Sequence, residues 1–240
     1  MEIRSLPTYA ELCEAAADQI CRILEEKPNA VFIFPTGNTP LGMFYVLEER
    51  YREGKVSFEQ AYLFELDEYL HEAGENGPTL FDWLQKSFLN YMNFREERVF
   101  SFNPKAADAQ KECDRIQAKL DSLGSVDLAI LGLGPNGHLA MNEPGTLIES
   151  TARVVKLSPA TLESNAAYWG EKIVIPKRGM TIGLSTFHDA KEVILMVNGS
   201  PKQEILKTVL DSECTPQLPA TLLHDIPGAI VYADKAALGE

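Results

Sequence analysis

The sequence predicts an α/β fold with a doubly wound, mostly parallel, Rossmann-like sheet and helices on both faces. Short apolar runs of the length of buried strands alternate along the chain with stretches of helical periodicity. This alternation implies right-handed crossover connections between parallel strands. No shift in composition, low-complexity linker or internal repeat interrupts the order. We therefore expect a single domain over residues 1–240.

The first elements carry the clearest signals. Residues 8–26 place apolar side chains at the 3.6-residue period of an amphipathic helix. The apolar run at 30–34 (AVFIF) suits a strand that is buried on both faces. A second helix follows, and Thr39 is its expected N-cap because Pro40 suits the first helical position.

The same alternation continues to the end of the chain. Further strand-like runs lie at 61–66, 98–102, 127–131, 154–157, 192–197 and 229–232. Further helical runs lie at about 78–90, 106–123 and 200–211. In the last of these, Ser200 is the expected N-cap and Pro201 takes the first helical position.

Composition and charge exclude several classes of protein. The chain is 45% hydrophobic and 24% charged, which is typical of a globular protein and excludes a disordered or fibrous one. A net charge of −13 argues against a nucleic-acid partner or an anionic membrane surface, because both would repel the protein. No apolar run approaches the roughly 20 residues that span a bilayer. The N-terminus also lacks the apolar core of a signal peptide, so we expect a cytoplasmic protein. The four cysteines show no CxxC spacing, which favours free thiols over a zinc site or disulfides.

Two predicted strand ends carry features of anion-binding helix starts. After the first strand, PTGNTP combines Gly37, which lets the backbone approach a ligand, with hydroxyl donors at a helix start. After the strand at 192–197, NGSPK places Lys202 in the first helical turn, where a cation is unfavourable unless an anion binds nearby. A well-capped turn and a solvated surface lysine are the plain alternatives. Together, the two helix starts favour a phosphate ligand.

Candidate acid–base residues follow two other strands. Asp67 and its neighbour Glu68 end an alternating apolar segment, where a partly desolvated carboxylate suits a general base. In GLGPNGHLAMNEPG, a tightly turned loop holds His138, and Glu143 follows five residues later. Histidine can accept and return a proton near neutral pH, and a carboxylate can fix its tautomer. The glycine spacing at 132–137 superficially suggests dinucleotide binding, but no suitable helix and acid follow, so we expect no nucleotide cofactor.

Five segments in order resemble the glucosamine-6-phosphate deaminase/isomerase family, which includes galactosamine-6-phosphate deaminase/isomerases, across nearly the whole chain. They are PTGNTPLG (35–42), FELDEYL (64–70), LGLGPNGHLAMNEPG (131–145), MTIGLSTFHDAKEVILMVNGSPK (180–202) and LPATLLH (218–224). The resemblance implies an aldose–ketose isomerisation coupled to loss of ammonia, with no metal or other cofactor. It places the chain among hydrolases and isomerases of amino-sugar metabolism.

The resemblance also implies roles for individual residues. Asp67 matches the base that moves a proton from C2 to C1, and His138 matches the residue that opens the pyranose ring. Glu143 matches the carboxylate partner of that histidine, and Asn136 occupies a further ring-opening position. The phosphate-binding positions fall on Thr36, Gly37, Asn38, Thr39 and Lys202.

The sequence departs from the glucosamine branch at two places. Ala167 stands where that branch usually carries an arginine that grips the phosphate, which leaves Arg178 and Lys172 as candidate replacements. A Ser-Tyr pair of the mobile lid is replaced by Thr79 and Leu80.

The expected activity is the conversion of glucosamine 6-phosphate to fructose 6-phosphate and ammonia. The same chemistry on galactosamine 6-phosphate, giving tagatose 6-phosphate, is the first alternative. A 6-phosphogluconolactonase and a non-catalytic sugar-phosphate-binding regulator are the others. The expected partner is a small amino-sugar phosphate, with no nucleic acid and no membrane, and a homo-oligomer remains open.

Overall fold

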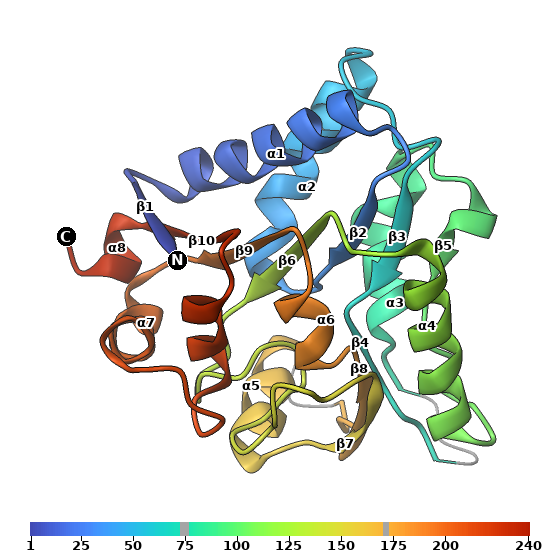
Figure 1. The fold of residues 1–240 in the computed structure, drawn as a ribbon, viewed down its shortest axis with the longest axis vertical. Coiled ribbons are helices and arrows are strands. Elements are labelled where there is room, and N and C mark those ends of the chain that lie inside the picture. The colour runs from blue at the N-terminus through green and yellow to red at the C-terminus, as the bar shows by residue number, and fades with distance from the viewer. Residues whose placement is uncertain (73–76, 170–172) are drawn as a thin grey trace.

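A seven-stranded sheet forms the centre of the protein in the computed structural model, which describes residues 1–72, 77–169 and 173–240 (Figure 1). All of its neighbouring strands pair in parallel, which confirms the predicted fold class. In spatial order the strands are β1 (Glu2–Leu6), β10 (Ala229–Asp234), β9 (Glu192–Val197), β6 (Leu128–Gly132), β2 (Val31–Phe34), β3 (Tyr62–Glu65) and β5 (Val99–Phe100).

Helices cover both faces of this sheet because its strands are apolar on both sides. In β2, Phe32 and Phe34 join the cluster under one set of helices, whereas Val31 and Ile33 join the cluster on the opposite face. The first face carries α1 (Tyr9–Glu26), α2 (Asn38–Arg52) and α3 (Leu80–Ser87). The second carries α4 (Ala109–Leu123), α6 (Leu184–His188), α7 (Gln203–Asp211), α8 (Lys235–Leu238) and the 3-10 segment η4 (Pro219–Asp225).

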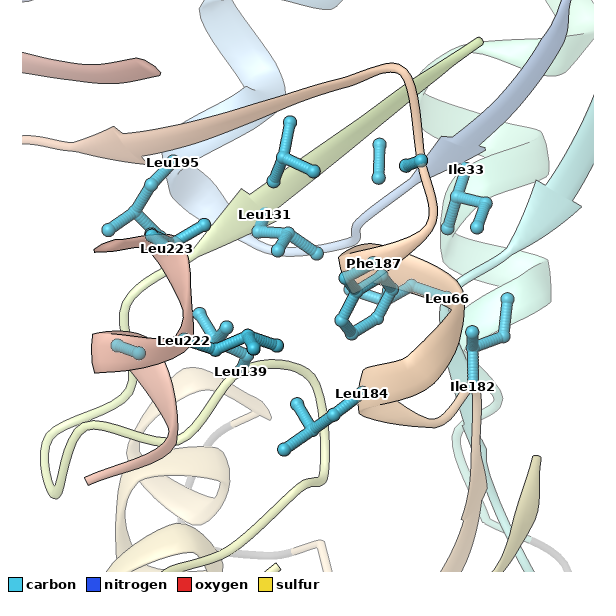
Figure 2. Close-up of a cluster of buried hydrophobic side chains, with 14 of the residues drawn as sticks. Ile33, Leu66, Leu131, Leu139, Ile182, Leu184, Phe187, Leu195, Leu222 and Leu223 are labelled. Atoms are coloured by element: carbon cyan, nitrogen blue, oxygen red, sulfur yellow. The ribbon is translucent and has the colours of Figure 1, made fainter. Parts of the chain in front are cut away.

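The second face is packed mainly by branched aliphatic side chains, together with the buried rings of Phe64, Phe102 and Phe187. Figure 2 shows Leu131 and Leu195 of the sheet on the side of Leu222 and Leu223 of η4, with Phe187 of α6 beside them. All five side chains are at most 2% exposed. Burial of each such side chain contributes about 1.5–3 kcal/mol to the free energy of unfolding, so this layer fixes the strand ends that carry the site.

The chain reverses its direction across the sheet between β2 and β6. From β2 the next strands, β3 and β5, add on one side, whereas from β6 the strands β9 and β10 add on the other. In open α/β sheets, ligands bind outside the carboxyl ends of the strands at such a point. The loops after β2 and β6 therefore flank the expected ligand position.

A second, antiparallel sheet lies below the central one in Figure 1. It consists of β4 (Asp67–Tyr69), β8 (Arg178–Thr181) and β7 (Arg153–Lys156), and α5 (Pro159–Trp169) packs against it. The predicted strand at 154–157 corresponds to β7 and thus lies outside the main sheet. Three of its residues are half-buried and Lys156 is exposed, unlike the fully buried central strands, which fits a place at the edge.

Three local predictions need correction. The N-cap of α2 is Gly37, with a φ of 104°, and not Thr39, whose hydroxyl is used elsewhere. The helix expected at 200–211 begins as a 3-10 turn, η3 (Ser200–Lys202), before α7, and the N-cap of this turn is Gly199 and not Ser200. Strands β1, β4 and β8 were not predicted, because none of them carries a run of apolar residues. Two further 3-10 turns, η1 (Leu89–Tyr91) and η2 (Glu96–Arg98), precede β5. In the described parts of the chain, no helix has the length and apolarity needed to cross a membrane.

Candidate active site

A cleft of about 760 Å³ opens at the reversal point of the sheet. It brings together the loop after β2, the start of β4, the loop after β6 and the turn after β9. The sequence-predicted residues that line it are Thr36, Gly37, Asn38, Thr39, Asp67, His138 and Lys202. Asn136 and Glu143 do not line the cleft, but they contact His138 from behind. All the predicted positions thus belong to one region.

One end of the cleft has the features of an anion site. The first backbone N–H groups of α2 follow Gly37, and no side chain in the described part of the chain caps them. Lys202 is the only lysine or arginine among the described residues that line the cleft. Its Nζ donates to Leu133 O at 2.6 Å, and burial lowers the pKa of its ammonium group. An anion near Lys202 would offset the cost of burying this charge.

The two loops at this end are joined by hydrogen bonds. Thr39 Oγ1 donates to Asn198 Oδ1 at 2.9 Å, which connects the start of α2 to the loop after β9. Asp234 of β10 accepts from the Gly199 N–H at 2.9 Å and also caps α8 by accepting from Ala237 N at 2.8 Å. No role was predicted for Asp234, and none was predicted for Asn198, although Asn198 is the first residue of the NGSPK segment.

Asp67 has the electrostatics of a base poised near neutral pH. Its side chain is 8% exposed. Burial, and to a lesser extent the charge of Glu68, raise the pKa of Asp67 to about 7. In β4 it pairs with Thr181 of β8, so the small sheet fixes the backbone from which this carboxylate reaches the cleft.

Glu68 is a structural acid. Its carboxylate accepts from the backbone N–H groups of Tyr69, Leu80 and Phe81 at 2.7, 2.8 and 3.0 Å. Leu80 and Phe81 start α3, so Glu68 anchors this helix to β4. Adjacent acids that looked equivalent in the sequence therefore have different tasks, since only Asp67 lines the cleft.

The second group is built around His138. His138 Nδ1 lies 3.7 Å from Glu143 Oε2, and Asn136 Nδ2 donates to the same carboxylate oxygen at 2.8 Å. Asn136 Oδ1 also accepts from the His138 backbone N–H at 3.2 Å. Burial alone would raise the pKa of Glu143, but contacts with His138, Thr161 and Asn136 outweigh it and hold the pKa below its usual range. Glu143 is therefore an anion beside the imidazole.

The loop between His138 and Glu143 is held in an unusual conformation. Ala140 has a φ of 54°, which non-glycine residues rarely adopt. Asn142, fully buried, stabilises the loop by donating to Leu139 O at 2.9 Å and to Ile182 O at 3.0 Å. Its Oδ1 accepts from Arg153 Nη1 at 2.8 Å. Asn142 was not predicted as part of the site, and its place in the NEPG motif was the available signal.

The cation missing at Ala167 is not supplied by Arg178. Arg178 lies at the exposed start of β8 and lines a neighbouring hollow with His71, outside the cleft. Lys172 lies outside the described residues. Leu80 lines the cleft, and Thr79 instead caps α3 by accepting from Asp82 N at 3.0 Å. In the described ranges, no group of His, Cys, Asp and Glu side chains is placed to hold a metal ion.

The sequence matches the model of the family described as glucosamine-6-phosphate isomerases/6-phosphogluconolactonase over residues 7–232. The chain belongs to this family. It is 32% identical to a glucosamine-6-phosphate deaminase of Thermoanaerobacter pseudethanolicus, over 99% of this chain and 94% of that protein. It is 33% identical to a protein of the same name from Clostridium tetani, over 99% and 98%.

Solved structures agree with this placement. A monomeric glucosamine-6-phosphate deaminase superimposes with a TM-score of 0.94 at 31% identity, covering 100% of this chain and 99% of that one. A 6-phosphogluconolactonase from Thermotoga maritima shares the fold, with a TM-score of 0.75 at 21% identity over 98% and 99% of the two chains.

One part of the sequence-based classification is wrong, namely the placement among hydrolases. The two relatives and the monomeric structure compared above, each at least 30% identical, are named as deaminases, and the lactonase shares only the fold. The deaminase/isomerase classification stands.

Proposed function

We propose that the protein converts glucosamine 6-phosphate to fructose 6-phosphate and ammonia. The observation that carries the proposal is one cleft that is lined by a buried acid of pKa about 7, by a histidine with a carboxylate partner and by a helix start suited to an anion. The relatives named as deaminases of this substrate support it.

The phosphate is assigned to the helix start of α2. Backbone N–H groups after Gly37, the hydroxyls of Thr36 and Thr39, and the ammonium of Lys202 line this end of the cleft. Charge-assisted hydrogen bonds to a phosphate are stronger than neutral ones. Bound here, the phosphate orients C1 and C2 of the sugar toward the acid–base residues.

Ring opening is assigned to His138. A neutral imidazole can take the proton of the anomeric hydroxyl and return it to the ring oxygen as the ring bond breaks. Glu143 stabilises the transient imidazolium, and Asn136 orients Glu143 and the His138 backbone. The three residues therefore act as one unit.

Isomerisation is assigned to Asp67. As a carboxylate it takes the proton from C2 while O1 takes a proton from the substrate ammonium group, which gives an enol-type intermediate. As an acid it then gives its proton to C1, which leaves a C2=NH2+ group. Water adds to C2, the C2–N bond breaks with release of ammonia, and the oxygen from water remains as the C2 carbonyl. A base whose pKa is about 7 exchanges protons efficiently at neutral pH, because both protonation states are populated.

An assay of ammonia release from glucosamine 6-phosphate and galactosamine 6-phosphate tests the proposal. We expect turnover of the glucosamine epimer. Preference for the galactosamine epimer would instead assign the protein to the galactosamine-6-phosphate deaminase/isomerases. Hydrolysis of 6-phosphogluconolactone without ammonia release would support a lactonase, and saturable binding of both amino sugars without turnover would support a regulator.

The location, the partners and the assembly of the enzyme can also be proposed. We propose a cytoplasmic enzyme with a small-molecule substrate and with no nucleic-acid or membrane partner. A relative described as monomeric supports activity without assembly, so we propose that the enzyme does not need a homo-oligomer.

A further inference from the structure

Thr161 of α5 lies between the two side chains assigned to ring opening. Its Oγ1 is 3.3 Å from His138 Nδ1 and donates to Glu143 Oε1. The direct separation between His138 Nδ1 and Glu143 Oε2 is 3.7 Å, which is too long for a hydrogen bond. The hydroxyl thus supplies the connection that the imidazole and the carboxylate do not make themselves.

We propose that Thr161 is the positioning residue of His138, and that its hydroxyl joins the imidazole to Glu143 and fixes the ring proton on Nδ1. The inference rests on the proposed function, because it concerns how the proton carrier of that reaction is held. Sequence analysis gave Thr161 no role.

The count of protons and lone pairs supports this arrangement. A threonine hydroxyl has one hydrogen and two lone pairs. Glu143 is an anion and can only accept, so the hydrogen of Thr161 points to Glu143. The lone pairs can then accept from Ser158 Oγ, at 3.0 Å, and from a protonated His138 Nδ1. The hydroxyl, which belongs to a residue that is 3% exposed, has its full set of partners in this way.

The tautomer decides which nitrogen does the chemistry. With the proton on Nδ1, neutral His138 carries its lone pair on Nε2. Nε2 then accepts the anomeric O1 proton as C1=O1 forms, the C1–O5 bond breaks with its electron pair on O5, and Nε2 returns the proton to O5. The reverse tautomer would offer an N–H where the reaction needs a base.

The start of α5 holds Thr161 in place. Ser158 Oγ accepts from Thr161 N at 3.2 Å, which is an N-cap contact, and Pro159 takes the first helical position. Ser158 N also donates to Glu143 Oε1 at 3.1 Å. The start of α5 therefore donates two hydrogen bonds to Glu143. Further along this helix, Ser164 and Asn165 line the cleft.

Two variants and a matched control test the proposal. Thr161→Val keeps the shape of the side chain and removes the hydroxyl, whereas Thr161→Ser keeps the hydroxyl. Thr186→Val is the control, because the buried Thr186 Oγ1 has no hydrogen-bond partner in the described part of the chain.

The first readout is the position of the proton on the neutral His138 ring by 15N NMR, with the signal assigned by its loss in His138→Gln. We expect Nδ1 protonation in the wild type and in Thr161→Ser, and loss of this preference in Thr161→Val. The second readout is turnover of ring-closed glucosamine 6-phosphate. It should fall about ten- to hundredfold in Thr161→Val, as for the loss of a hydrogen bond to a charged group. Thr161→Ser should recover most of it, and Thr186→Val should match the wild type.

A wild-type His138 protonated on Nε2 would overturn the proposal, even in an active enzyme. So would a Thr161→Val protein with unchanged His138 signals and unchanged turnover. If Thr161→Val does not fold, the spectra of the wild type and of Thr161→Ser still decide. A wild-type protein with the Nδ1 proton but without ammonia release would support the role of Thr161 while refuting the proposed function.

Discussion

Replacing Gly134 with alanine should lower activity strongly through a single neighbour, His138. A Cβ at Gly134 would lie 2.2 Å from both Cδ2 and Nε2 of the His138 ring and 2.4 Å from Cε1. Carbon atoms in van der Waals contact are about 3.5–4.0 Å apart. The ring therefore has to move by more than about 1 Å, because the methyl group is fixed to the backbone.

The size of the loss follows from this displacement. Misplacement of a reacting group by about 1 Å can cost roughly 10²-fold in rate, so we expect kcat/KM to fall about a hundredfold. Gly134 is not among the glycines with positive φ, and the clashing atoms belong to a rotatable side chain. The variant should therefore fold, with a loss of at most about 1–3 kcal/mol in the free energy of unfolding.

The assay is ammonia release from ring-closed glucosamine 6-phosphate, together with thermal unfolding. Gly132→Ala, two residues earlier at the end of β6, is the matched control, because a Cβ at Gly132 meets no atom within 4 Å. We expect the control to retain activity within a few-fold of the wild type. Activity of Gly134→Ala within threefold of the wild type, or an equal loss in both variants, would refute the reasoning about His138.

Three further predictions concern the base and the phosphate site. Asp67 accepts a proton only when ionised, and its pKa is raised to about 7, so kcat/KM should fall about tenfold per pH unit below pH 7. A flat profile between roughly pH 5 and 7 would contradict its role as the base. Asp67→Asn should lower kcat about 10²–10⁴-fold, while calorimetry should find the affinity for a sugar phosphate within a few-fold of the wild type. Turnover close to that of the wild type would remove Asp67 from the mechanism. Lys202→Ala should raise KM about ten- to hundredfold and change kcat less, because the phosphate is remote from C1 and C2. An unchanged KM would place the phosphate elsewhere.

The central strands could be predicted because each is a continuous apolar run. The edge strand β1 could not, since four of its five residues are exposed and their side chains follow no apolar pattern. The second sheet was missed for a related reason. Its β8 is four residues long, begins with the exposed Arg178 and contains Gly179, so it carries no strand signal. A strand that is buried on both faces of a sheet can therefore be predicted from its apolar run, whereas an exposed edge strand has no such run.

The position of the site could be predicted, but its internal hydrogen bonds could not. Strand ends of a parallel sheet share one edge, so Asp67 and His138 were expected to line the same cleft, as they do. Thr161, Asn198 and Asp234 were missed because their partners are remote in the sequence, and such residues usually lie in turns and on surfaces. The N-cap role predicted for Thr39 was wrong for the same reason, since its hydroxyl donates to Asn198 and does not cap its own helix.

The hydrogen bond between Thr39 and Asn198 has a thermodynamic consequence for ligand screening. It joins loops that are 159 residues apart, so a ligand held by both loops binds the folded chain and not the unfolded one. By mass action, a ligand at 100 times its Kd adds about 2.7 kcal/mol to the free energy of unfolding. For a domain of this size, each kcal/mol raises Tm by about 2–4 °C, so saturation should give a shift of about 5–10 °C. Melting curves can therefore rank sugar phosphates by affinity in proteins that no longer turn them over, and the epimers at C4 can be compared without any catalytic step.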